Sequence, residues 1–151
     1  MSGSIYETGI QYLLEQIELL CEVSTIESIR KAKRKAAELA DTTLSLVNSK
    51  EIDIASFYYL KALEEVGRIK ILQDNPGDEI LRLEGASVEN ADHEMQVARD
   101  SRIQAALAYL VRENEFCCIV KIGTRFVIRK DVPESELKRA VVSLKTKLAF
   151  L

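Results

Sequence analysis

Five of the six residues from Arg30 to Lys35 are basic, although the chain of 151 residues carries a formal net charge of −3. Positive charge gathered on one short element is typical of a surface that binds phosphates. Such a run on a helix is also often only the solvent-exposed side of that helix, so the sequence leaves both interpretations open. The candidate nucleic-acid-binding residues in this run are Arg30, Lys31, Lys33, Arg34 and Lys35.

A second basic group lies nearer the C-terminus, in a stretch that has no acid between Phe116 and Lys130. Acids gather instead from Asp74 to Asp100, where eight of them accompany two bases. Charge is therefore segregated along the chain, which favours contact with a polyanion. The second group adds four candidate nucleic-acid-binding residues: Lys121, Arg125, Arg129 and Lys130.

Side chains that form catalytic or metal sites are few. His93 is the only histidine and stands among acids, so we expect a solvated polar residue there. Cys117 and Cys118 are adjacent and would point to opposite faces of a strand, which prevents a zinc clamp. We therefore predict no enzyme activity, no cofactor and no metal; an enzyme that uses only carboxylates stays open as an alternative.

Aromatic side chains give a weaker signal for base stacking than the charges give for phosphate binding. Tyr58 and Tyr59 would add stacking if they reached the basic surface. We expect instead that Tyr58 lies in the core and Tyr59 at its edge.

The composition predicts a globular, mainly helical chain. Hydrophobic residues make up 47% of it, which suffices for a core, and there are only two prolines. No apolar run approaches the roughly 18 residues of a membrane span, and the first residues lack the features of a signal peptide. Three cysteines, an odd number, argue against a disulfide framework. We expect a cytoplasmic protein without membrane contact.

Apolar residues repeat at helical spacing in the first half of the chain. They predict a helix from about Tyr6 to Glu22 and another from Ser24 to about Asn48, each opened by a capping-box pair. A third helix follows, with Asp53 as its cap. On the second helix, four basic side chains project opposite the apolar stripe, whereas Lys33 falls within it and must snorkel or face a partner.

In the second half of the chain, the spacing of the apolar residues changes from helical to strand-like. A turn at residues 75–78 is the best internal boundary. A helix from about Asp92 or Asp100 to Arg112 precedes two β-rich runs that flank Gly123-Thr124, which suits a type II′ hairpin turn. The sequence therefore predicts a mainly α fold, a helical bundle with a small hairpin-containing insertion before the C-terminal helix. The helical domain comprises residues 1–75 and 131–151, and the insertion with short strands comprises residues 76–130.

This layout resembles the small subunit of archaeal type I-A CRISPR Cascade complexes. The resemblance covers the helices from Tyr6 to about Asp74, the insertion from Pro76 to Lys130 and the returning helix from Glu134 to Leu151. It implies a non-catalytic role in antiviral defence. The protein would pack on other Cascade subunits and help hold crRNA-guided target or displaced DNA, which we expect to be single-stranded. It implies no small-molecule substrate, and the basic helix would be the contact surface.

Two alternatives come from other classes. In a winged-helix DNA-binding regulator, a helix over residues 101–115 would place Arg102 and Gln104 at base edges, and Lys121 and Arg125 on the hairpin would contact phosphate. The acidic segment before that helix argues against this reading. In an adaptor or scaffold without nucleic-acid contact, the charges would only solvate the surface.

Overall fold

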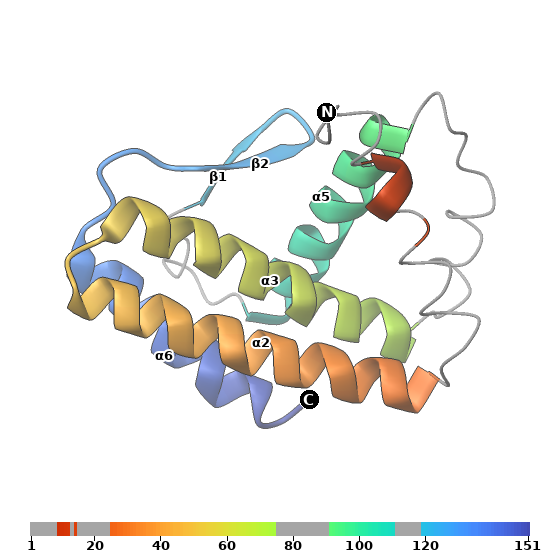
Figure 1. The fold of residues 1–151 in the computed structure, drawn as a ribbon, viewed down its shortest axis with the longest axis horizontal. Helices are drawn as coiled ribbons and strands as arrows, with labels where there is room; N and C mark the ends of the chain where they lie inside the picture. The colour runs from red at the N-terminus through yellow and green to blue at the C-terminus, as the bar shows by residue number, and fades with distance from the viewer. Residues whose placement is uncertain (1–8, 13, 15–24, 75–90, 111–118) are drawn as a thin grey trace.

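The computed structural model describes residues 9–12, 14, 25–74, 91–110 and 119–151 (Figure 1). Its elements are α2 (Thr25–Asn48), α3 (Ile52–Asp74), α5 (Ala91–Leu110), β1 (Ile119–Ile122), β2 (Arg125–Ile128) and α6 (Glu134–Leu148). The predicted mainly α fold with a hairpin before the C-terminal helix is confirmed. Of the predicted first helix, only residues 9–12 and 14 are described, and they are helical. The predicted turn at 75–78 and both Cys117 and Cys118 lie outside the described residues.

Helix α3 forms the centre of the bundle. Its buried residues occur around most of its circumference, as expected of a helix that neighbours cover on several sides. Helix α2 runs alongside it, α5 crosses it, and α6 packs against α2 (Figure 1). The shared core includes Ala36, Val47, Leu63, Val66, Ile103, Leu107, Ile119, Leu137, Val141 and Leu144. The predicted insertion thus contributes α5 and β1 to the same core as the helices on either side of it.

The crossing of α3 and α5 depends on Gly67. A Cβ atom at this position would overlap the backbone carbonyl group of Arg102 on α5 and would lie 2.7 Å from the Arg102 Cα. Only a residue without a side chain lets two helix backbones approach so closely. Arg102 itself has no exposed surface.

Helix α2 ends in a Schellman motif, close to where the sequence predicts. The Lys50 N–H donates to the Val47 carbonyl at 3.0 Å, and the Glu51 N–H donates to the Leu46 carbonyl at 3.0 Å. Lys50 has a φ of 65°. The Glu51 carbonyl then accepts the first hydrogen bond of α3, from the Ala55 N–H at 2.9 Å. The predicted cap at Asp53 is therefore wrong, because Asp53 lies inside the first turn of α3.

Two ion pairs align α6 with α2. Lys50 Nζ lies 2.8 Å from Glu134 Oε1 at the start of α6, and Lys145 Nζ lies 2.6 Å from Asp41 Oδ1 near its end. From the first pair to the second, residue numbers rise along α6 and fall along α2, so the two helices run antiparallel.

The hairpin closes through the predicted glycine. Ile122 pairs with Arg125 across a two-residue turn. Gly123 has a φ of 63°, whereas the φ of Thr124 is not positive. Positive φ at the first turn residue alone is the pattern of a type II′ turn.

The two faces of the hairpin differ. Opposed residues share a face, so Ile119 and Ile128 lie on the same side as Lys121 and Phe126. Ile119 is buried, which identifies this side as the one that packs on the helices. The other side carries Val120, Ile122 and Arg125, all of them exposed, together with the half-buried Val127.

Candidate nucleic-acid interface

Helix α2 presents its basic run to solvent. Ala32 within the run and Ala36 directly after it are buried and anchor the helix to the core, while Lys33 is half-buried. The exposed cations form two pairs at four-residue spacing, so the members of each pair lie about one turn apart, or about 6 Å along the helix axis: Arg30 with Arg34, and Lys31 with Lys35. The predicted orientation is confirmed, since the four cations expected outside are exposed: Arg30, Lys31, Arg34 and Lys35.

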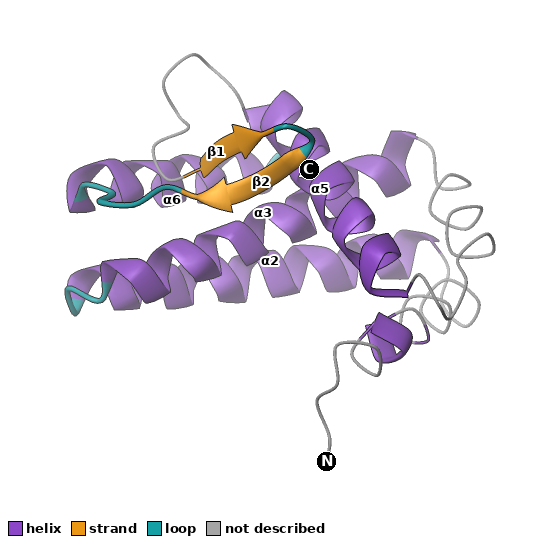
Figure 2. Cartoon of the chain, turned by 90° about the horizontal axis from the view of Figure 1, so that it is seen from above, coloured by secondary structure: helices purple, strands orange, loops and turns teal. Residues whose placement is uncertain are grey.

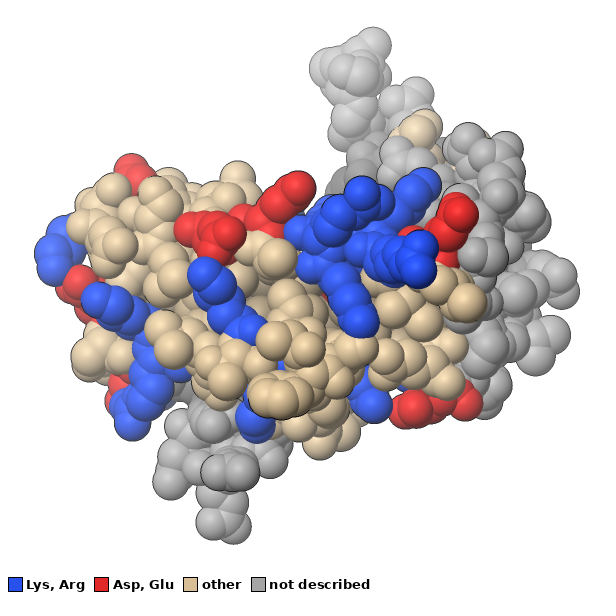
Figure 3. Space-filling view, turned by 90° about the horizontal axis from the view of Figure 1, so that it is seen from below, with Lys and Arg blue, Asp and Glu red and all other residues tan. Residues whose placement is uncertain are grey.

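Nearby acids neutralise little of this charge. In the ranges that the structure describes, no acid pairs with Arg30, Lys31 or Arg34. Asp41, an acid on the same helix, is already paired with Lys145. Figure 3 shows the result from below: the largest group of basic side chains gathers on the side where Figure 1 places the N-terminal half of α2. We call Arg30, Lys31, Arg34 and Lys35 the basic face.

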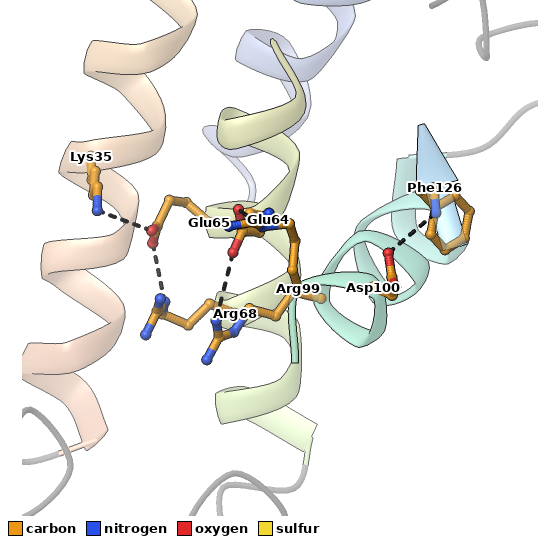
Figure 4. Close-up of polar contacts among 8 residues, drawn as sticks. Lys35, Glu64, Glu65, Arg68, Arg99, Asp100 and Phe126 are labelled. Atoms are coloured by element: carbon orange, nitrogen blue, oxygen red, sulfur yellow. Dashed lines mark hydrogen bonds and ion pairs between the residues drawn. The ribbon is translucent and has the colours of Figure 1, made fainter. Parts of the chain in front are cut away.

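A cluster of charges lies behind the basic face, between α2, α3 and α5 (Figure 4). Glu65, only 6% exposed, contacts Lys35 Nζ through Oε1 at 3.4 Å and Arg68 Nε through Oε2 at 3.2 Å. Lys35 is thus the one member of the basic face with an acid partner among the described residues. Because Glu65 holds it against α3, Lys35 is less available to an outside anion than the other three cations.

Glu64 organises the other half of the cluster. Its carboxylate lies 3.4 Å from Arg99 Nε and 3.7 Å from Arg102 Nη1. Burial raises the pKa of Glu64, and the attraction of Arg99 opposes that rise only in part. Burial also lowers the pKa of Arg102 to about 10, which leaves the guanidinium charged at neutral pH. These pairs fix α5 against α3; the Arg102 side chain is fully buried there, whereas the Arg99 side chain is 42% exposed.

The second predicted basic group does not join the first. The hairpin lies on the far side of α3 from α2 (Figure 1, Figure 2). Lys121 Nζ lies 3.5 Å from Gln104 Oε1 on α5, and Arg129 Nη2 lies 3.5 Å from Glu136 Oε2 on α6. Arg125 and Lys130 are exposed. Two of the four cations therefore contact different neighbours, and the group forms no continuous surface with α2.

Arg102 cannot contact bases as the winged-helix alternative requires. Arg102 is fully buried against Gly67 and near Glu64, so the expected contact of Arg102 with base edges is wrong. Gln104 is exposed, but it contacts Lys121. No local pattern in the sequence reveals this burial, because it depends on residues of another helix, among them Glu64.

The two tyrosines exchange the places that the sequence predicts. Tyr59 is 5% exposed, whereas Tyr58 is half-buried, so the expectation of Tyr58 in the core and Tyr59 at its edge is wrong. Tyr59 follows Ala55 and precedes Leu63 at four-residue spacing, and all three are buried on one stripe of α3. Sequence reasoning also missed a cation–aromatic contact beside them, in which Lys61 Nζ lies 4.7 Å from the ring centroid of the exposed Phe57.

Neither a metal-ligand cluster nor a membrane-spanning helix is present among the described residues. His93 is exposed on α5, as predicted. Across residues 9–12, 14, 25–74, 91–110 and 119–151, no group of three His, Cys, Asp or Glu side chains is placed to hold a metal. None of the helices in these ranges is both long and apolar enough to cross a membrane. Comparison of the chain with protein-family models, curated proteins and solved structures gave no match.

Proposed function

We propose that this protein binds the phosphate backbone of nucleic acid through the basic face of α2 and catalyses no reaction. The observation that carries the proposal is the presence of three exposed cations without an acid partner in the described chain: Arg30, Lys31 and Arg34. The net charge of −3 gives the whole molecule no attraction for a polyanion, so binding must arise from this local face. Contacts of this kind do not depend on sequence and weaken with salt.

We further propose that the protein is a cytoplasmic small subunit of a crRNA-guided Cascade complex. The support is the arrangement of elements, in which helices lead to a hairpin and a closing helix, as in the layout that carries the resemblance. The basic face would hold single-stranded target or displaced DNA. Exposed apolar side chains on other elements would pack on neighbouring subunits, among them Ile54, Phe57, Ile122, Val142 and Phe150.

The two alternatives stand differently. A winged-helix regulator is disfavoured, because α5 buries Arg102 instead of offering it to a base. An adaptor without nucleic-acid contact keeps the same fold and differs only in what the basic face does. The test must therefore separate phosphate binding from no binding.

The test measures fluorescence anisotropy of labelled single- and double-stranded oligonucleotides of unrelated sequence, at 50 and 200 mM salt. The informative variant is Arg30→Gln/Lys31→Gln, since glutamine keeps the helix propensity of the residues it replaces. Its matched control is Lys138→Gln/Arg139→Gln, which removes an equal number of exposed positive charges, one lysine and one arginine, from α6. Because α6 runs antiparallel to α2 and meets Asp41 only near its own end, these two cations lie far from Arg30.

Each phosphate contact on a single strand contributes about −0.7 to the slope of log K against log salt. Three free cations predict a slope of about −2.1, which is a loss of roughly 20-fold in affinity between the two salt concentrations. The α2 variant should retain a slope of about −0.7 and bind more weakly to every sequence, while the α6 control should bind as the wild type does. Equal losses in both variants, or no binding by the folded wild type, would reject the basic face as the phosphate site.

A further inference from the structure

A groove of about 370 Å³ opens between α5 and the hairpin. Its volume falls at the lower end of the range for small-ligand sites. The hairpin, which forms one wall of the groove, lies on the far side of α3 from α2 (Figure 1), so the groove is separate from the proposed phosphate surface. Val97, Asp100, Ser101 and Gln104 line it from α5, and Lys121, Thr124 and Phe126 line it from the hairpin.

Asp100 is held in place by the hairpin backbone. The Phe126 N–H donates to Asp100 Oδ1 at 3.2 Å (Figure 4). Ile122 and Arg125 close the hairpin as a hydrogen-bonded pair, so the next pair is not hydrogen-bonded and the Phe126 N–H points away from β1. The other carboxylate oxygen, Oδ2, has no hydrogen-bond partner in the described chain. It is therefore a fixed acceptor at the groove, suited to an amino group.

Lys121 supplies the opposite charge at the same groove. Its ammonium lies 3.5 Å from Gln104 Oε1 and 5.7 Å from the centroid of the Phe126 ring. The side chain is exposed, and the described chain gives it no acid partner, so it is available to an anion. The Phe126 ring and Val97 add apolar surface against which a flat group can lie. One groove therefore combines an acceptor, a cation and an aromatic wall.

We propose that this groove binds a nucleotide whose base carries an exocyclic amino group, with cytidine as the simplest case. The amino group donates to Asp100 Oδ2, the base lies against Phe126, and the phosphate pairs with Lys121. A carboxylate accepts from the N4 amino group of cytosine, whereas uracil presents a carbonyl oxygen at the same position and is disfavoured. This inference goes beyond the proposed function, because the basic face reads phosphate alone and the groove distinguishes bases.

The test follows backbone amide shifts of the full chain during titration with cytidine monophosphate and, separately, uridine monophosphate. We expect shifts at α5 and the hairpin and a preference for cytidine monophosphate of about tenfold or more, the usual size for a hydrogen bond to a charged group. Asp100→Asn should reverse the preference, because its amide nitrogen donates to the uracil carbonyl. Lys121→Gln should weaken both nucleotides equally, whereas its matched control Arg125→Gln, on the outer face of the hairpin, should change neither.

Further arms separate this proposal from the previous one and identify the source of the nucleotide. Arg30→Gln/Lys31→Gln should leave binding of cytidine monophosphate unchanged, so the two proposals succeed or fail independently. In that variant, tighter binding of a cytidine-rich strand than of a uridine-rich strand would assign the groove to a strand, whereas equal affinity for the two strands, with the preference for cytidine monophosphate retained, would assign it to the free nucleotide. Equal affinity of the wild type for both mononucleotides, or an absence of shifts at the groove, would overturn the proposal.

Discussion

Replacing Gly67 with alanine should destabilise the fold, although alanine is the better helix former. In an exposed helix, this substitution stabilises by about 1 kcal/mol. In α3 the new methyl group would overlap the Arg102 carbonyl and lie 2.7 Å from the Arg102 Cα. The obstacle is backbone, so no side-chain rotation relieves it.

The size of the effect follows from the distance. Carbon atoms in contact usually lie about 3.5 Å apart or more, so the Arg102 Cα alone requires the helices to separate by roughly 0.8 Å. Overpacking of this kind typically costs 1–3 kcal/mol, and a backbone obstacle places it near the top of that range. Subtracting the gain in helix propensity leaves a net loss of about 2 kcal/mol. For a chain of this length, that corresponds to a fall of roughly 4–8 °C in Tm.

Urea unfolding followed by circular dichroism measures this loss. Ser45→Ala, at an exposed position of α2, is the control, because it gains helix propensity without meeting another element. We expect Gly67→Ala to unfold at lower urea than the wild type, and Ser45→Ala at the same or higher urea. Amide hydrogen exchange should also quicken in α5, whose packing on α3 is loosened. A Gly67→Ala protein as stable as the wild type would show that the two backbones are not in contact.

Three further predictions concern charge and backbone conformation. Because burial raises the folded-state pKa of Glu64 above its ordinary value of 4.5, the folded state retains a proton there that the unfolded chain has lost. The free energy of unfolding of the wild type relative to that of Glu64→Gln should therefore fall as pH rises from about 4.5 through the folded-state pKa. Urea unfolding at a series of pH values measures this difference between the two proteins, and a difference that does not change with pH would contradict the prediction. Lys50 has a φ of 65°, so Lys50→Gly should be more stable than Lys50→Ala by about 1 kcal/mol in the same assay; equal stability would argue against strain at this cap. Glu65→Gln releases Lys35 from its partner at 3.4 Å and should steepen the salt slope of oligonucleotide binding by about 0.7, whereas an unchanged slope would mean that Lys35 faces no phosphate.

The sequence predicts well wherever one local period dominates. Helix α2 has a regular apolar stripe over its 24 residues, so its extent and the outward direction of its cations follow from the 3.6-residue period. The hairpin follows from β-rich runs around Gly123, whose positive φ the turn requires. In both cases the determining residues are neighbours in the chain.

Features that depend on distant residues escape this reasoning. The close approach of the Arg102 backbone to α3 requires Gly67 on that helix, and the restraint on Lys35 requires Glu65 across the α2–α3 interface. The groove escapes for the same reason, since Asp100 on α5 and Phe126 on the hairpin meet only in the folded chain. The first turns of α5 are acidic and lack an apolar stripe, which is why its start at Ala91 was not resolved from the sequence.

Helix α6 also sets the order of events during synthesis. Its pair between Lys145 and Asp41 joins residues 104 positions apart, so the side of α2 that α6 contacts stays uncovered until the end of the chain has been made, although α3 can already pack on α2. At about 5–20 residues per second, translation from the end of α3 at Asp74 to the end of α6 at Leu148 takes roughly 4–15 s. During that interval the core lacks the residues that α6 supplies, among them Leu137, Val141 and Leu144. Apolar surface that α6 later covers is therefore exposed for these seconds, and transiently exposed apolar surface is prone to aggregate.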